Sequence, residues 1–217
     1  MNGVLLMRPV VGILGTIHNE SLREQYHCSL DLYREVIHRF EPDLICGEVH
    51  PDSWQKYLNN KHEQGYWGEP ASEYWELIFP YCEEHGVEFV PIDWFELDVW
   101  NDFDPFLPFP EEKRLVLEKQ DDEWFQMQMD TWSYGNIPFN SAEFDQVTKQ
   151  KYEWMYEVNS AAVNFRWIVR NQIMIQRAKN AIKANTQRKI LCVVGADHNY
   201  LFHEGLKSEQ ILLQYPL

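Results

Sequence analysis

Four short apolar runs organise the chain. In each run, apolar residues occupy consecutive positions rather than alternate ones, which is typical of strands covered on both faces of a parallel sheet. Polar or turn-forming residues end every run, so each run predicts one strand. The predicted strands are residues 10–17, 43–49, 87–93 and 188–196, followed by an edge strand at 210–217.

Helical periodicity fills the intervals between these strands. From residue 20 to residue 40, apolar residues recur at steps of three and four, which predicts one amphipathic helix that Pro42 blocks from continuing. A helix over 71–84 is predicted to end at Gly86, a residue type that suits the backbone just past a helix C-terminus. The remaining predicted helices are a short one after His50, one long or two abutting helices over 151–185, and a short one over 200–207.

The alternation of strands and helices predicts a single α/β domain over residues 1–217, with an open, mostly parallel sheet flanked by helices. Residues 94–150 interrupt this alternation, because they are dense in aromatics, acids and prolines and show helical patches but no sheet pattern. They predict a largely helical insertion between the third and fourth strands. The insertion is either a lid or pocket wall, or a segment whose aromatic residues only pack it onto the core. Those aromatic residues are Trp94, Trp100, Phe103, Phe106 and Phe109.

Two matching turns follow the first and the fourth predicted strands. Each has the pattern G-x-x-H, ending at His18 in one case and at His198 in the other. The glycines that begin the turns, Gly15 and Gly195, remove side chains where the backbone turns sharply or approaches another group. A single histidine at a strand end is usually a capping residue, but a matching pair favours a functional site.

Carboxylates end the two strands that lie between these turns in the sequence. Glu48 and His50 follow the second strand, and Asp93 follows the third. In an open α/β sheet, ligands bind in the crevice outside the carboxyl ends of the parallel strands. We therefore expect these side chains and the two histidines to converge at one edge of the sheet.

The converging residue types suit a metal site. His18, Glu48 and His198 are candidate ligands for a divalent ion, because two histidines and one glutamate bind Zn²⁺ in hydrolases and leave a position for water. The same set suits manganese or iron. A metal-free site is also open, with a histidine as general base and Glu48 or Asp93 orienting it.

Arg170 lies in the helix predicted over 151–185. If the surrounding surface is buried, this arginine needs an acidic partner, and Glu48 and Asp93 are the candidates. The other interpretation is a surface arginine on a long helix.

Composition narrows the classes of partner. The net charge of −15 argues against nucleic acid and against an anionic membrane surface, since both are bound through clustered Lys and Arg. No apolar run approaches the roughly 20 residues of a membrane span, and the first ten residues lack the features of a signal peptide. The four cysteines have no C-x-x-C spacing and are expected to be reduced. We expect a cytoplasmic protein that binds a small molecule or a peptide, and a homodimer is left open.

Together these motifs resemble the TraB/PrgY and Tiki superfamily, whose wider circle includes the erythromycin esterase-like and the ChaN-like haem-binding proteins. The resemblance covers the two ends of the chain and leaves residues 94–156 unmatched. It rests on GTIH ending at His18, LICGEV with Glu48, PID with Asp93, the R-N-x-x-M of Arg170, Asn171 and Met174, and GADH ending at His198 before Tyr200 and Leu201.

The resemblance implies an α/β core with helical insertions and a site built from the two G-x-x-H histidines, the glutamate and the arginine. Tiki-like members are metal-dependent peptidases, TraB and PrgY limit a peptide pheromone signal, and the erythromycin esterases hydrolyse a lactone ester without a metal. This chain differs from the membrane-bound members in having no span. It also has His50 where an acidic companion of Glu48 is expected.

We therefore predict a hydrolase, metal-assisted, that acts on a peptide or a small ester. The two histidines and the glutamate would hold the ion, Asp93 or His50 would handle the proton, and Arg170 would stabilise developing oxyanion charge or anchor a substrate carboxylate. The alternatives are a metal-free esterase-like hydrolase and a non-catalytic protein that sequesters haem or a signalling peptide. An inactive member of the fold is a third.

Overall fold

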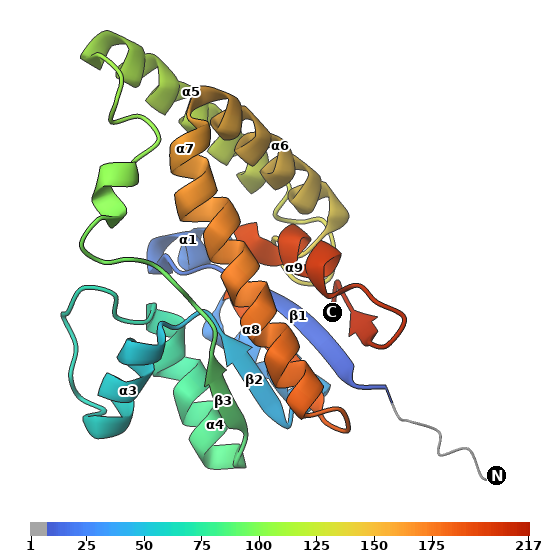
Figure 1. Ribbon diagram of the computed structural model, residues 1–217. Helices are drawn as coiled ribbons and strands as arrows, with labels where there is room; N and C mark the ends of the chain where they lie inside the picture. The colour runs from blue at the N-terminus through green and yellow to red at the C-terminus, as the bar shows by residue number, and fades with distance from the viewer. Residues whose placement is uncertain (1–7) are drawn as a thin grey trace.

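The computed structural model describes residues 8–217, which fold around a sheet of five parallel strands (Figure 1). Along the sheet the strands follow the order β3-β2-β4-β1-β5, and every neighbouring pair is parallel. The predicted α/β class is confirmed. The strands are β1 (Val10–Thr16), β2 (Leu44–Gly47), β3 (Glu88–Pro91), β4 (Lys189–Gly195) and β5 (Leu212–Gln214).

Helices cover both faces of the sheet, because side chains of opposite parity along each strand enter two separate apolar layers. In β4, Leu191 and Val193 join one layer, while Cys192 and Val194 join the other. Packing against the first layer are α2 (Leu30–Phe40), α3 (Pro51–Asn59) and α4 (Phe79–His85). Packing against the second are α8 (Arg170–Ala184) and α9 (Asn199–Leu206).

The helix predicted over 20–40 is wrong as a single element. The structure has α1 (Glu20–Gln25) and α2, with His27 between them in the left-handed region at φ 55°. The Ser29 hydroxyl caps α2 by accepting a hydrogen bond from the Leu32 N–H. Apolar spacing is similar in both helices, so periodicity alone did not reveal the break. The break turns α1 toward the end of β1, where Arg23 donates to the carbonyls of Ile17 and His18.

The helical boundary predicted at residue 151 is also wrong, because α6 (Ala142–Val158) runs through it. The chain breaks instead at Asn159, whose backbone angles, φ −152° and ψ 86°, are not helical. Beyond the break, α7 (Ser160–Val163), a π-helical stretch (Asn164–Val169) and α8 follow one another. The helix predicted over 71–84 likewise begins with a π-helical stretch (Tyr74–Ile78) before α4, and it ends as predicted at Gly86, with φ 66°.

The segment between β3 and β4 is mainly helical. Its longest helix, α5 (Glu111–Met129), lies beside α6, and the two extend away from the sheet in Figure 1. No helix within residues 8–217 is long and apolar enough to cross a membrane. Residues 1–7, which make up most of the segment tested for a signal peptide, lie outside the described residues.

Asn140, in the loop between α5 and α6, fastens this insertion to the sheet. The strand β5 pairs only with Val10–Gly12, so Gly15 lies beyond its reach. The Asn140 side chain makes the hydrogen bonds that a neighbouring strand would otherwise make. Its Oδ1 accepts from the Gly15 N–H at 2.7 Å, and its Nδ2 donates to the Gly15 carbonyl at 3.0 Å. One buried amide thus pairs two backbone groups that no strand reaches.

We expect Asn140→Ala to lower the free energy of unfolding by about 2–4 kcal/mol, because it leaves both buried backbone groups of Gly15 without a partner. Urea denaturation would measure the change. The matched control is Asn136→Ala, an exposed position in the same loop, which should change stability by less than about 0.5 kcal/mol. Equal effects of the two substitutions would contradict this role for Asn140.

Candidate functional site

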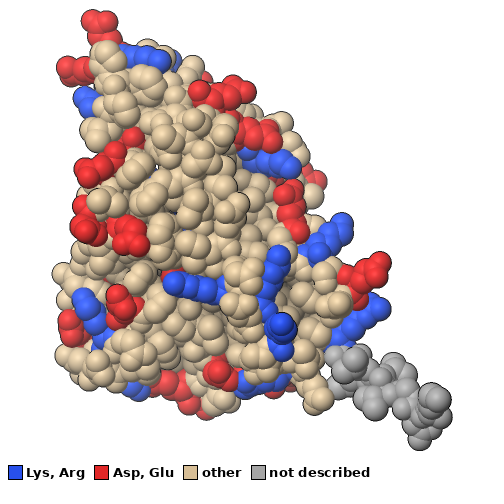
Figure 2. All heavy atoms as spheres, viewed as in Figure 1, with Lys and Arg blue, Asp and Glu red and all other residues tan. Residues whose placement is uncertain are grey.

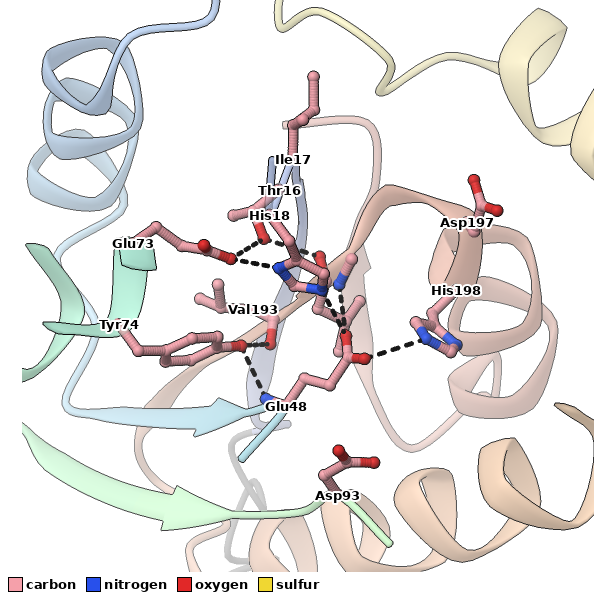
Figure 3. A network of polar contacts seen from close by, with 12 residues as sticks. Thr16, Ile17, His18, Glu48, Glu73, Tyr74, Asp93, Val193, Asp197 and His198 are labelled. Carbon is pink, nitrogen blue, oxygen red and sulfur yellow. Dashed lines mark hydrogen bonds and ion pairs between the residues drawn. The ribbon is translucent and has the colours of Figure 1, made fainter. Parts of the chain in front are cut away.

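The strand order brings the predicted site residues to one edge of the sheet. Because β4 lies between β2 and β1, the residues that follow β3, β2, β4 and β1 form a row. The row is Asp93, Glu48, His198 and His18. In Figure 3 the Glu48 side chain reaches between the two imidazole rings.

Glu48 is the centre of this row, and it is 8% exposed. The His198 Nε2 lies 3.2 Å from its Oε1, and the His18 Nε2 lies 3.5 Å from its Oε2. The two matching turns therefore present the same ring nitrogen to opposite oxygens of one carboxylate. The Gly195 N–H also donates to Oε2, at 2.6 Å.

The other nitrogen of each ring is held by a second layer of acceptors. The His18 Nδ1 lies 2.5 Å from the Glu73 Oε1, and the His198 Nδ1 lies 2.7 Å from the Asn171 Oδ1. Asn171 is oriented by its Nδ2, which donates to the Trp167 carbonyl at 2.8 Å, so its oxygen faces His198. Both Nδ1 atoms therefore face acceptors and carry a proton. The two Nε2 atoms are the ring nitrogens that face Glu48.

Arg170 binds both acids that the sequence offered as partners. Its Nε and Nη2 donate to the two Asp93 oxygens at 2.7 and 2.8 Å, and Nη2 also donates to the Glu48 Oε1 at 2.7 Å. Burial raises the pKa of Glu48, but His198, Arg170 and His18 lower it more, so this pKa lies well below its usual range. Glu48 is therefore a carboxylate at neutral pH.

The glycines of the two G-x-x-H turns allow close approach. A Cβ on Gly195 would lie 2.8 Å from the His18 Nε2 and 3.3 Å from the Glu48 Oε2. A Cβ on Gly15 would lie 2.2 Å from the buried Asn199 Nδ2. Any larger residue at Gly195 would separate His18 from Glu48, so this glycine determines the geometry of the site directly.

The sequence did not identify Glu73 and Tyr74 as site residues. Glu73 is fully buried and contacts His18, and it also accepts from the Thr16 hydroxyl at 3.0 Å. The Tyr74 hydroxyl accepts from the Glu48 N–H at 2.8 Å and donates to the Val193 carbonyl at 2.9 Å. One signal was present: Glu73 precedes the apolar Leu77 by four positions, which puts an acid on the buried face of the predicted helix.

His50 lies outside this network, although it follows the same strand as Glu48. Its Nδ1 caps α3 by accepting from the Asp52 N–H at 3.2 Å, and its ring lies 5.0 Å from the ring of Phe95, centroid to centroid. In the neutral ring the proton is therefore on Nε2. His50 lines a small pocket together with Glu48 and Arg170.

Two pockets meet at His18, Glu48 and Arg170, and they have volumes of about 350 and 170 Å³. The larger one is walled partly by the insertion, through Phe125, Met129, Phe139 and Phe144. The aromatics singled out from the sequence do not line it. Trp94, Trp100 and Phe103 instead pack on Phe165, and Phe106 packs on Trp154.

Within residues 8–217, no group of three or more His, Cys, Asp or Glu side chains already has the arrangement of a metal site. In the cluster described above, the histidine nitrogens contact Glu48 directly rather than surrounding a common point. The side chains of His18, Glu48 and His198 would have to move out of these contacts to share one ion.

The protonation of His18 gives a test of this electrostatic arrangement. Burial lowers its pKa, but the charges of Glu73 and Glu48 raise it more, so the pKa lies well above the usual value. We expect Glu73→Gln to lower the His18 pKa, as measured by NMR titration of the histidine ring protons in a chelating buffer. Protonated His18 stabilises the folded state below its ordinary pKa of about 6.5, and this contribution is lost as pH rises through the raised value. The loss should therefore begin at lower pH in Glu73→Gln.

Glu76→Gln, an exposed position three residues further along, is the control and should leave the His18 titration unchanged. An ordinary His18 pKa in the wild-type protein would contradict the proposed arrangement, and so would an identical pKa in Glu73→Gln.

Comparison of the chain with protein-family models, with curated proteins and with solved structures finds no match in any of the three. The superfamily resemblance therefore depends on the sequence motifs alone.

Proposed function

We propose that the protein is a metal-assisted hydrolase that acts on a peptide or a small ester at the cluster around Glu48. One observation carries the proposal. Two imidazoles from distant, matching turns direct Nε2 to the two oxygens of one buried carboxylate, while each Nδ1 is held by a separate acceptor. Histidines that bind metals commonly have their second nitrogen fixed in this way.

His18, Glu48 and His198 would hold the ion, which is zinc, manganese or iron. Glu73 and Asn171 hold the two rings through Nδ1, so an ion would bind at Nε2, where it would displace the proton of His18 and take the place of the present contacts with Glu48. When bound, the ion would polarise a substrate carbonyl and lower the pKa of a water molecule.

The other residues have roles that follow from their contacts. Asp93 accepts two hydrogen bonds from Arg170, so it positions the arginine and is poorly suited to take up a proton. The Arg170 Nη1 has no hydrogen-bond partner among residues 8–217, and Arg170 lines both pockets, so Nη1 is available to a developing oxyanion or a substrate carboxylate. His50 lines the smaller pocket with its Nε2 proton uncommitted and would donate it to a leaving group.

The pockets indicate the shape of a substrate. The larger pocket has apolar and aromatic walls, and the smaller one is bordered by Glu48, Asp93 and His50. A substrate whose scissile bond lies at Glu48 would place its apolar part against the insertion and its smaller polar part beside His50.

The four buried cysteines are free thiols, and we keep the cytoplasm as the proposed location on that ground.

A metal-free hydrolase is the second candidate, and the raised pKa of His18 favours it. A protonated His18 can donate to Glu73 and to Glu48 at once, and the cluster is then stable without any ion. In that mechanism His18 supplies the proton and Arg170 the oxyanion contact. Sequestration of haem is less favoured, because both Nε2 atoms face Glu48 rather than the open pocket.

Elemental analysis of protein purified without a His tag tests the metal ligands. We expect about one equivalent of a divalent metal in the wild type, and at least a tenfold loss in His18→Ala and in His198→Ala. Glu73→Gln should weaken metal affinity by 10–100-fold through its contact with His18. His62→Ala, an exposed histidine in a loop, is the matched control and should retain the metal.

Hydrolysis of a panel of p-nitrophenyl esters and fluorogenic peptides, with and without chelator, completes the test. Activity that chelation abolishes and metal restores would support the proposal. Activity that survives chelation but is lost in His18→Ala would favour the metal-free candidate. Equal metal content in the wild type and both histidine variants would exclude the proposed ligands.

A further inference from the structure

A second pocket, with a volume of about 590 Å³, lies between α6, α8 and α9. It is distinct from the cavity at the proposed site, because His18, Glu48 and His198 do not line it. The two regions adjoin: Tyr152 and Trp167 line both pockets, and Asn171, which holds the His198 Nδ1, lines the groove from its other side. The proposed hydrolase chemistry does not use this pocket, which we call the α6–α8 groove.

The inner wall of the α6–α8 groove is formed by stacked aromatic rings. The Trp167 indole is stacked between Tyr152, at 3.7 Å between ring centroids, and His198, at 4.4 Å. Its Nε1 donates to the Tyr200 hydroxyl at 3.2 Å. Val163, Ile168 and other aliphatic residues complete an apolar lining, so the groove can remove a ligand's apolar body from water.

Acidic residues surround this apolar lining. Glu153, Glu157 and Glu204 lie along the rim, with Lys149 as the cation among the lining residues. Lys149 pairs with Glu204 at 3.2 Å, and neither Glu153 nor Glu157 has an ion-pair partner in the part of the chain that the structure describes. Figure 2 shows a largely uncharged surface between α6 and α8, with acidic side chains along the α6 side.

The negative charge extends to the groove wall. The Tyr152 hydroxyl in this wall donates to the Asp197 Oδ2 at 3.1 Å, so a further carboxylate lies directly behind the aromatic rings. A positive charge in the groove would therefore be favoured by the rim carboxylates and by the faces of the aromatic rings. A carboxylate ligand would be repelled by the same groups.

We propose that the α6–α8 groove binds a small organic cation with an apolar body, such as an aryl-alkyl ammonium compound. Its ring or chain packs against Trp167 and the aliphatic lining, and its ammonium group lies at the rim beside Glu153 and Glu157.

The test is calorimetric titration of the full-length protein with three probes of matched size: 2-phenylethylammonium, 3-phenylpropanoate and 2-phenylethanol. We expect the ammonium compound to bind with one-to-one stoichiometry and at least tenfold more tightly than the carboxylate or the alcohol. Equal affinities for the ammonium compound and either other probe, or failure of the ammonium compound to bind, would overturn the proposal.

Variants locate the site. The double substitution Glu153→Gln and Glu157→Gln should weaken ammonium binding at least fivefold, whereas Glu143→Gln, exposed on the same helix but outside the groove, should not change it. Gln172→Trp, at an exposed lining position, should fill the groove and abolish binding. Binding that persists in Gln172→Trp, with the fold verified by circular dichroism, would place the ligand elsewhere. His18→Ala should bind normally, which separates this site from the proposed hydrolase.

Discussion

The burial of the Glu48 carboxylate is the constraint on which the site depends. An ionised carboxylate taken out of water is strongly destabilising unless charged and polar donors surround it. Here the donors are Arg170, the Gly195 N–H, His198 and His18, and they come from α8 and from the ends of β4 and β1. None of them is near Glu48 in the sequence. They meet because β4, the last long strand in the sequence, enters the sheet between β1 and β2, so the same topology that completes the sheet also neutralises the charge.

Two π-helical stretches adjoin the residues through which the helices contact the site, Arg170 at Glu48 and Glu73 at His18. Glu73 immediately precedes Tyr74–Ile78, and Arg170 immediately follows Asn164–Val169. A π-helical turn contains an extra residue, so it rotates the side chains on one side of it relative to those on the other. Tyr74, Leu77 and Ile78 can then pack in the core while Glu73 still reaches His18. In each of the two helical segments, the π-helical turn therefore allows the apolar residues to pack on the sheet while a neighbouring polar residue contacts the site.

The sequence revealed the strand-end residues because a general property of parallel sheets places them. Apolar runs that end in His18, Glu48 and Asp93 must bring those residues to one edge, whatever the details of packing. Glu73 and Asn140 were not predicted, since their partners depend on the rotation of a helix and the path of a loop, which local periodicity does not specify. The break near His27 was missed for a related reason: it depends on a left-handed backbone conformation, which is uncommon in any non-glycine residue and leaves no mark on the apolar periodicity. Tertiary contacts, not local pattern, decide such positions.

The charges in the cluster explain why one geometry supports both a metal-assisted and a metal-free interpretation. Three carboxylates and two guanidinium groups lie together there: Glu48, Glu73, Asp93, Arg23 and Arg170. These groups sum to one negative charge, and most of them are almost completely buried. A further positive charge is therefore required for the cluster to be neutral. A proton on the His18 Nε2 supplies it, whereas a divalent ion that replaced this proton would bring the sum to one positive charge. In the proposed function, proton and metal would compete for one lone pair, so the pH and the available metal would decide which of the two proposed chemistries operates.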